Sequence, residues 1–253
     1  MNCCQRNFVY KISRTYSSMV TESKKEKFIK RFSKISQLIN QEDDITDASP
    51  LSNRFPRGHI KPKEGDSSVL LPLVDIDDKT HLIYTKRSMT MRTHKGQICF
   101  PGGRLDPNET WEMAALREAE EEIHLKKHHI DVWTPMRPIS NREMTATVTP
   151  IVGYIKNPDT LQHLNSVTDE VDVVIAVPIH ELLTNHHYTF FRLKVSFTLP
   201  YFESRKYKLL YTKYDNYVKP EFYRIWGLTG VITHQFLLNF APESYKTKVR
   251  LPI

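Results

Sequence analysis

The stretch that decides the fold runs from Gly102 to Leu125 and reads GGRLDPNETWEMAALREAEEEIHL. Its Ala, Leu, Met and Glu residues have high helix propensity, which predicts a helix from about Thr110 onward. Asn108, with carboxylates close behind it, is the predicted N-cap of this helix. Small residues such as Ala115 and Ala119 remain for packing, so the helix has one packed face and one charged face.

The charged face carries a high concentration of glutamates. Residues three and four apart share a helix face, so Glu118 points the same way as Glu121 and Glu122. With Glu120, these acids crowd the C-terminal end of the helix, where the dipole favours cations and like charges repel each other. A divalent cation would convert that repulsion into ligation, and oxygen ligands suit magnesium or manganese. The alternative is a solvated acidic face, which is what most glutamate runs form.

Six residues of this stretch have characteristic spacings from one another. They are a glycine, an acid six positions later, an Arg-Glu pair and a Glu-Glu pair: Gly103, Glu109, Arg117, Glu118, Glu121 and Glu122. The spacing resembles the Nudix box, G-x5-E-x7-R-E-U-x-E-E-x-G-U, in which U is a bulky aliphatic residue. Ala119 is smaller than that aliphatic residue. His124 replaces the last glycine, at a cost of about 1 kcal/mol if the helix ends in a left-handed turn.

The resemblance implies a metal-dependent hydrolase of diphosphates linked to nucleosides, with Mg²⁺ or Mn²⁺ as the cofactor. The ligands it implies are Glu118, Glu121 and Glu122. A metal ion screens the negative oxygens of a phosphoric anhydride and acidifies an attacking water. We expect Glu109 and Arg117 to pair and fix the loop to the helix, with a substrate clamp as the second option for Arg117. The proton acceptor is either Glu118 or an acid of a later loop, such as Glu170.

A second signature lies just upstream, where residues 83–103 read IYTKRSMTMRTHKGQICFPGG. Nine positions follow the pattern LLTxR[S/A]x3Rx3Gx3FPGG: Thr85, Arg87, Ser88, Arg92, Gly96, Phe100, Pro101, Gly102 and Gly103. This pattern resembles the coenzyme A diphosphatase branch of the Nudix hydrolases, although Ile83 and Tyr84 replace its two leucines. The resemblance implies coenzyme A or acyl-coenzyme A as the small-molecule substrate.

Six residues of this signature are predicted to contact the substrate: Arg87, Arg92, Gly96, Phe100, Gly102 and Gly103. Guanidinium groups bind phosphate oxygens bidentately, which makes Arg87 and Arg92 candidate phosphate ligands. The alternative for both arginines is a salt bridge to a nearby acid. Phe100 either lines the pocket or packs in the core, and the glycines let the backbone approach a ligand closely.

The rest of the chain predicts an α/β fold, an α/β/α sandwich of the Nudix type with a mixed central sheet. Residues 23–40 form an amphipathic helix, and residues 41–66, with three prolines, form a connector. Predicted strands cover 68–76, 81–85, 97–100, 130–136, 145–155, 171–177, 191–199, 207–211 and 222–226. A terminal helix is expected over 229–240.

The positive charge of the chain is concentrated near its start. The chain has 253 residues and a net charge of +7. Residues 1–35 hold nine of its 36 basic residues and two of its 29 acidic ones, so the remaining residues are neutral in sum. A nucleic-acid footprint would spread across the folded body, so we expect no nucleic-acid partner. No apolar run approaches the ~18 residues of a membrane-spanning helix, so we expect no stable membrane insertion. The sequence leaves the oligomeric state open.

Residues 1–21 contain no acid and mix Arg and Lys with apolar and hydroxyl residues. This composition resembles a mitochondrial transit peptide, with a possible cut after Tyr16; the alternative is a disordered basic tail. The chain ends in Leu-Pro-Ile and lacks the peroxisomal Ser-Lys-Leu address, so mitochondria are the expected location. The predicted organisation is a transit peptide (1–21), a helix and connector (22–66) and a Nudix domain (67–253).

Three classes of function are compatible with the sequence. The first is a coenzyme A diphosphatase that gives adenosine 3',5'-bisphosphate and the 4'-phosphopantetheine part. The second is a Nudix enzyme acting on NADH, ADP-ribose or an oxidised nucleotide, against which the signature in residues 83–103 argues. The third is a non-catalytic ligand-binding module, against which the intact Glu118, Glu121 and Glu122 argue.

Overall fold

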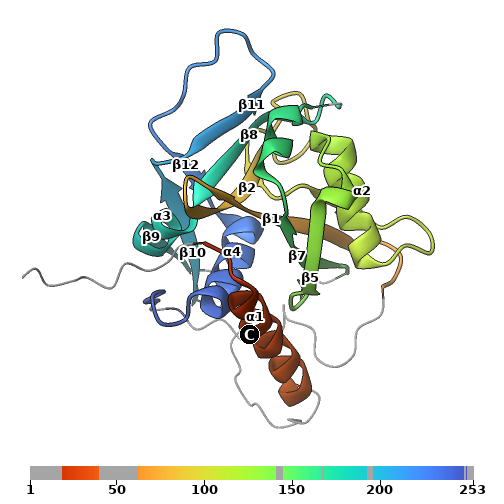
Figure 1. The fold of residues 1–253 in the computed structure, drawn as a ribbon, viewed down its shortest axis with the longest axis vertical. Helices are drawn as coiled ribbons and strands as arrows, with labels where there is room; N and C mark the ends of the chain where they lie inside the picture. Colours follow the sequence, from red (N-terminus) through yellow and green to blue (C-terminus); the bar gives the residue numbers. More distant parts are fainter. Residues whose placement is uncertain are drawn as a thin grey trace, which may run out of the picture.

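The structure is a computed structural model that describes residues 19–39, 62–140, 145–166, 168–192, 196–247 and 249. Its main sheet within these ranges has nine strands. They are β1 (Ser67–Ile76), β2 (Lys79–Arg87), β3 (Ile98–Cys99), β4 (Gly102–Arg104), β5 (Ile130–Pro135), β6 (Ile139–Ser140), β7 (Thr147–Ile155), β8 (Val171–Pro178) and β11 (Lys208–Thr212). The order β11-β8-β2-β1-β7-β5 forms its body, while β3, β4 and β6 pair with β2, β1 and β7 (Figure 1). Because β1 and β7 are parallel and the other pairs antiparallel, the predicted mixed sheet is confirmed.

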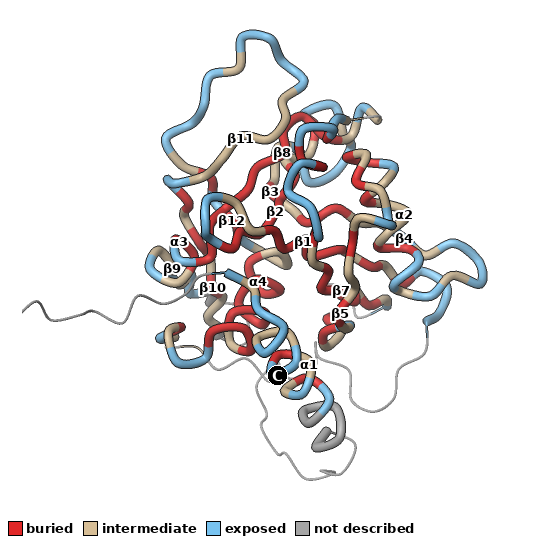
Figure 2. The backbone as a smooth tube through the Cα atoms, viewed as in Figure 1, coloured by how far each residue is buried: buried red, intermediate tan, exposed pale blue. Residues whose placement is uncertain are grey.

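The first two strands, both predicted, form a hairpin. Asp77 and Asp78 make its two-residue turn with φ of 49° and 57°, and Ile76 pairs with Lys79. Positive φ at both turn residues matches the right-handed twist of the flanking strands. Most of β1 and β2 is buried, as the red tube through the centre of Figure 2 shows.

Helices cover both faces of the sheet (Figure 1). They are α1 (Glu22–Ile39), α2 (Trp111–Ile123), α3 (Ile179–Thr184) and α4 (Gly227–Phe240), with 3-10 turns η2 (Lys127–His129) and η3 (Pro158–His163). On one face Phe28 of α1 lies 5.5 Å from Phe236 of α4 and 5.8 Å from Trp133 of β5, ring centre to ring centre. On the other face the small buried residues of α2 pack with Leu70 and Ile83. Successive strand residues point to opposite faces, so one apolar strand serves both cores.

The prediction of a single strand over residues 191–199 is wrong. The chain forms β9 (His186–Arg192) and β10 (Ser196–Ser204), which pair antiparallel, and β12 (Tyr223–Ile225) completes a second, three-stranded sheet. A period-two pattern continues through a hairpin unchanged, so alternation alone does not reveal the reversal. Pro200, just past the predicted end of that strand, lies inside β10 opposite Tyr188.

The predicted N-cap of α2 is also wrong. Thr110, not Asn108, caps the helix, and its hydroxyl accepts the Met113 N–H at 3.2 Å. Asn108 lies in the preceding turn with φ of 67°. At the other end His124 has φ of 59°, which confirms the left-handed helix end expected at this position.

Several predictions fall on other parts of the chain. Residues 1–18 of the predicted transit peptide and most of the connector lie outside the described residues, whereas the predicted helix after residue 22 is confirmed as α1. The boundary between residues 66 and 67 stays a prediction. Among the described residues, no helix is both long and apolar enough to span a membrane.

Candidate active site

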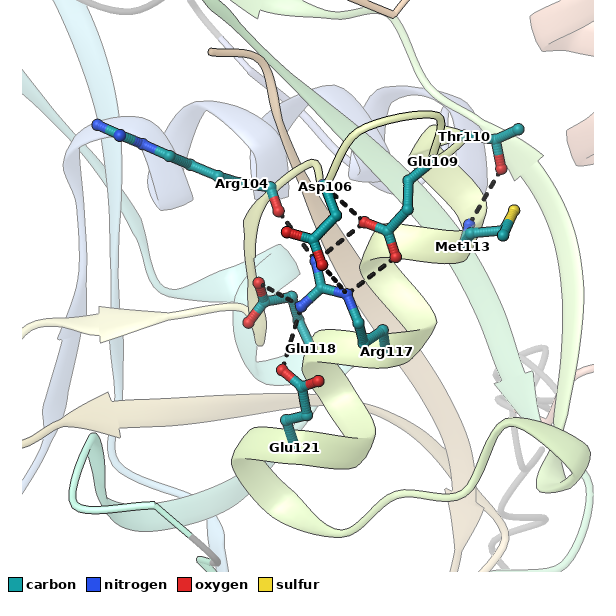
Figure 3. A network of polar contacts seen from close by, with 8 residues as sticks. All are labelled: Arg104, Asp106, Glu109, Thr110, Met113, Arg117, Glu118 and Glu121. Atoms are coloured by element: carbon teal, nitrogen blue, oxygen red, sulfur yellow. Dashed lines mark hydrogen bonds and ion pairs between the residues drawn. The ribbon is translucent and has the colours of Figure 1, made fainter. Parts of the chain in front are cut away.

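Arg117 of α2 lies at the centre of a network of carboxylates and carbonyl oxygens (Figure 3). Its Nε and Nη2 donate to the two carboxylate oxygens of Glu109 at 2.9 and 3.0 Å. Its Nη1 donates to Glu118 at 3.0 Å and to Glu121 at 3.1 Å, and its Nη2 also donates to the carbonyl of Arg104 at 3.0 Å. One guanidinium therefore joins the loop before α2 to the charged face of the helix.

The predicted pairing of Glu109 with Arg117 is confirmed by this bidentate contact. Glu109 also accepts the backbone N–H of Asp106 at 2.9 Å, so it closes the loop on itself. The hydrogen bond from Arg117 lowers the pKa of Glu109. Both carboxylate oxygens of Glu109 are therefore engaged within the chain. The Arg117 guanidinium, which the clamp option requires to be free for substrate, is bonded to acids of the chain itself.

Glu118 and Glu122 lie one turn apart on α2 and face the glycine turn that leads into β4. A Cβ atom at Gly103 would lie 2.2 Å from Oε1 of Glu118, so this position has room for the carboxylate only without a side chain. Glu122 is 4% exposed. Burial and the adjacent Glu118 raise the pKa of Glu122 to about 8, and Arg87 partly opposes them. Burial also raises the pKa of Glu118, against the effect of Arg117.

Arg87 and Glu170 bring charge to the same place from the strands behind α2. Arg87 ends β2, Glu170 directly precedes β8, and the strands pair with Arg87 opposite Val171. Nη2 of Arg87 lies 3.6 Å from Oε2 of Glu170, as the ion-pair alternative predicted. Nε of Arg87 is buried without a hydrogen-bond partner in the part of the chain described. Glu170 contributes to the raised pKa of both Glu118 and Glu122.

The loop after β2 is held by two backbone hydrogen bonds, one of them to Asp172, an acid that the sequence did not single out. The backbone N–H of Ser88 donates to the carbonyl of Glu170 at 2.7 Å, and that of Met89 donates to Oδ2 of Asp172 at 3.4 Å. Asp172 is 1% exposed within β8. The available signal was an acid inside the apolar run 171–177, since buried acids need partners.

The other predicted substrate residues have different surroundings. Arg92 is exposed on the loop after β2, and Gly96 has φ of 65° where that loop closes, its N–H donating to the Arg87 carbonyl at 3.1 Å. The substrate role of Phe100 is not supported, because Phe100 is 3% exposed and stacks on Tyr84 with ring centres 4.6 Å apart. Phe100 therefore packs in the core, which was the alternative prediction for this residue.

Gly102 also has a packing role that the sequence did not predict. A Cβ atom there would lie 2.3 Å from the Ser68 carbonyl oxygen, and its φ is 154°. The glycine therefore allows β4 to pair closely with β1. Its backbone opposes the raised pKa of Glu122, so it still contributes to the site.

The predicted metal trio is only partly brought together. Among the described residues, no three His, Cys, Asp or Glu side chains form a group ready to hold a metal ion. The reason is Arg117, which draws Glu118 and Glu121 to its own guanidinium, and the Glu121 side chain is 53% exposed. Glu118 and Glu122 fit a hard divalent cation, because both are oxygen donors in a site where negative charge is poorly compensated. The metal role of Glu121 stays a prediction.

The chain belongs to the Nudix family: the NUDIX domain matches residues 66–195. It is therefore a hydrolase of phosphoric anhydrides that acts on a nucleoside diphosphate derivative. Nudix hydrolases generally use divalent metal ions.

Named relatives place the chain more closely within the family. It is 41% identical over 180 residues to Nudix hydrolase 3 of Caenorhabditis elegans, covering 71% of this chain and 75% of the relative. It is 33% identical over 199 residues to the mitochondrial coenzyme A diphosphatase NUDT8 of Mus musculus, covering 76% and 86%. The peroxisomal coenzyme A diphosphatase NUDT7 of Mus musculus is 38% identical over 117 residues, covering 46% and 48%. By sequence the chain belongs with the coenzyme A diphosphatase branch.

Proposed function

We propose that this protein hydrolyses the diphosphate bond of coenzyme A and acyl-coenzyme A. The products are adenosine 3',5'-bisphosphate and 4'-phosphopantetheine or its acyl form. The observation that carries the proposal is the pair of half-buried Glu118 and buried Glu122 beside Arg87, whose Nε has no partner among the described residues. The likeness to relatives named coenzyme A diphosphatases supports the choice of substrate.

In this proposal Glu118 and Glu122 hold a magnesium or manganese ion, with Glu121 as the third ligand once it leaves Arg117. Such an ion neutralises charge on the anhydride and lowers the pKa of an attacking water. Glu109 holds Arg117 in place, and Arg117 in turn fixes the position of the Glu118 carboxylate before substrate binds.

Arg87 and Glu170 act on the substrate side of the same site. Arg87 binds a phosphate oxygen through its guanidinium, whose Nε has no hydrogen-bond partner among the described residues and whose Nη2 lies 3.6 Å from Glu170. Exposed Arg92, on the loop that Ser88 and Asp172 anchor, supplies a second phosphate contact. Glu170 accepts the proton of the attacking water, because its side chain is 46% exposed whereas that of Glu118 is 18% exposed and bonded to Arg117.

A substrate panel tests the proposal directly. The full chain is incubated with coenzyme A, acyl-coenzyme A, NADH, ADP-ribose and an oxidised nucleotide, each with Mg²⁺, Mn²⁺ or a chelator, and products are identified by mass. We expect adenosine 3',5'-bisphosphate from the coenzyme A substrates only with metal present. Faster turnover of NADH or ADP-ribose would show a Nudix enzyme that prefers another nucleoside diphosphate derivative. Turnover in chelator would contradict the metal assignment.

We also propose that the protein is imported into mitochondria, on the basis of the acid-free basic stretch in residues 1–21. Relatives include proteins named as mitochondrial and as peroxisomal. Deleting residues 1–16 is expected to leave turnover unchanged and to abolish import into isolated mitochondria. Cytosolic or peroxisomal full-length protein would contradict this location.

A further inference from the structure

Two adjoining cavities lie at the end of the sheet away from the charged site. Arg87 ends β2 opposite Val171, whereas His81 near the start of β2 pairs with Pro178 at the end of β8. The nine residues of β2 span roughly 25 Å at about 3.3 Å per residue. Figure 1 shows α3, which borders both cavities, on the opposite side of the molecule from α2.

The smaller cavity, of about 280 Å³, is lined by basic side chains. Lys79, Lys206 and Lys208 line it together with the imidazoles of His81 and His180. Asp77 is the acid among its lining residues, and it is already paired with Lys208. Two ammonium groups and two imidazoles therefore face a space whose acid is neutralised, which suits an oxyanion.

The larger cavity, of about 420 Å³, shares Lys79 and His180 with the first, at the end of the sheet where both open. Its apolar wall comes from Ile179 and Leu183 of α3 and from Phe240 and Ala241 at the end of α4. Three of these four residues are buried, so the apolar wall belongs to the core. Ser244 lines the same space.

A further cation stands at the edge of the apolar cavity. Nζ of Lys24 lies 5.3 Å from the centre of the Phe240 ring and donates to the Met19 carbonyl at 3.1 Å. Burial lowers the pKa of Lys24. The hydrocarbon stem of such a lysine covers apolar surface while its amine stays near a polar group. Lys24 therefore adds both apolar surface and positive charge to the cavity.

We infer that the two cavities form one binding site for a single-chain lipid with an anionic head. The carboxylate or phosphate head lies among Lys79, Lys206 and His180, and the aliphatic tail lies against Ile179, Leu183 and Phe240. A small anion alone would leave the apolar wall empty, and a neutral hydrocarbon would place no negative charge beside Lys79 and Lys206. Cavities of this size and mixed character are typical of small-molecule sites. The site is separate from the hydrolytic site and does not depend on the proposed function.

Calorimetric titration of the full chain tests this inference, with palmitate and lysophosphatidate as separate probes below their micelle concentrations. Acetate and inorganic phosphate provide the head groups without a tail. We expect saturable one-to-one binding of at least one lipid, which also identifies the head group, and at least tenfold weaker binding of acetate and phosphate.

Two variants locate the site. Lys79→Glu reverses the charge shared by both cavities and should weaken lipid binding about tenfold, while Ser244→Phe fills the apolar cavity and should weaken it at least tenfold. Lys127→Glu, the same charge change on exposed η2, should bind like the wild type. All three should keep wild-type hydrolysis, which also shows that they are folded.

The inference is overturned if neither lipid binds saturably, if acetate or phosphate binds as tightly as the lipids, or if both cavity variants retain wild-type affinity. Loss of hydrolysis in Lys79→Glu with unchanged lipid binding would likewise contradict it. Failure of the substrate panel leaves these outcomes unaffected, because binding is measured without turnover.

Discussion

The two helices that cover opposite faces of the sheet are built differently. Apart from Ile123, α2 buries three alanines and one acid, Glu122, and the opposite side of the helix carries charge. In contrast, α4 is buried almost all round, and Phe236 and Phe240 join the aromatic cluster with Phe28 of α1. Small side chains contribute little apolar burial, so the helix that holds the site contributes less to stability than the helix on the other face. Activity and stability should therefore respond to different substitutions.

The largest expected effect separates two glutamates of the same helix. Glu122→Gln keeps the size of the buried side chain but removes a proposed metal ligand, so kcat should fall roughly a thousandfold, because charge stabilisation by a metal is worth several kcal/mol. Glu120→Gln is the matched control and should keep wild-type kcat. Glu120 points away from the site and accepts a hydrogen bond from Lys126 at 2.9 Å. Thermal unfolding should show both variants folded. Full activity of Glu122→Gln would contradict the metal assignment.

A substitution on the face covered by α1 and α4 should lower stability without changing activity. Phe28→Ala removes a ring that is 1% exposed and contacts three other aromatic residues of β5 and α4, so the free energy of unfolding should fall by about 3 kcal/mol. Its kcat per folded molecule should stay at the wild-type value. Met113→Ala on α2, at a residue that is 54% exposed, is the control and should change stability by less than about 0.5 kcal/mol. Equal destabilisation by both substitutions in urea titrations would remove the contrast between the helices.

Two adjacent glycines sharpen the comparison within the site itself. Gly103→Ala places a Cβ atom against the flexible Glu118 carboxylate, so kcat should fall about tenfold with little loss of stability. In Gly102→Ala the new atom meets the backbone of Ser68 and Val69, which is unable to rotate away, so stability should fall by more than about 1 kcal/mol. Paired measurements of kcat and urea unfolding check both. The reverse order of effects would show that Gly103 does not make room for Glu118.

The smallest expected effect concerns left-handed residues at the ends of the two helices. His124→Gly relieves a non-glycine residue at φ of 59° after α2 and should stabilise the protein by about 1 kcal/mol without changing kcat. Gly227→Ala at the start of α4, where φ is 62°, should cost about the same amount. Both changes are measured as shifts in the urea midpoint. A destabilised His124→Gly would mean that the imidazole makes a contribution larger than the backbone strain.

Particular residues show where sequence patterns were sufficient and where they failed. The pairing of Glu109 with Arg117 and the left-handed helix end at His124 were expected from the resemblance to the Nudix box, whose residues all lie within one local segment. The N-cap was misplaced by two residues, since Asn and Thr both cap helices and only the turn before α2 decides between them. The hairpin of β9 and β10 was missed because its alternation continues across the reversal.

By itself the sequence determined the family, the acidic helix, the mixed sheet and the acids that face one another, because these follow from short-range spacing and periodicity. Only the tertiary structure decided that Phe100 packs on Tyr84, that Arg87 and Glu170 join Glu118 and Glu122, and that Arg117 holds Glu121 aside. It also placed Lys79 of the β1–β2 hairpin beside the apolar end of α4. These juxtapositions depend on which strands pair and which helix faces meet, and that choice is made by the burial of the whole core rather than by any local segment.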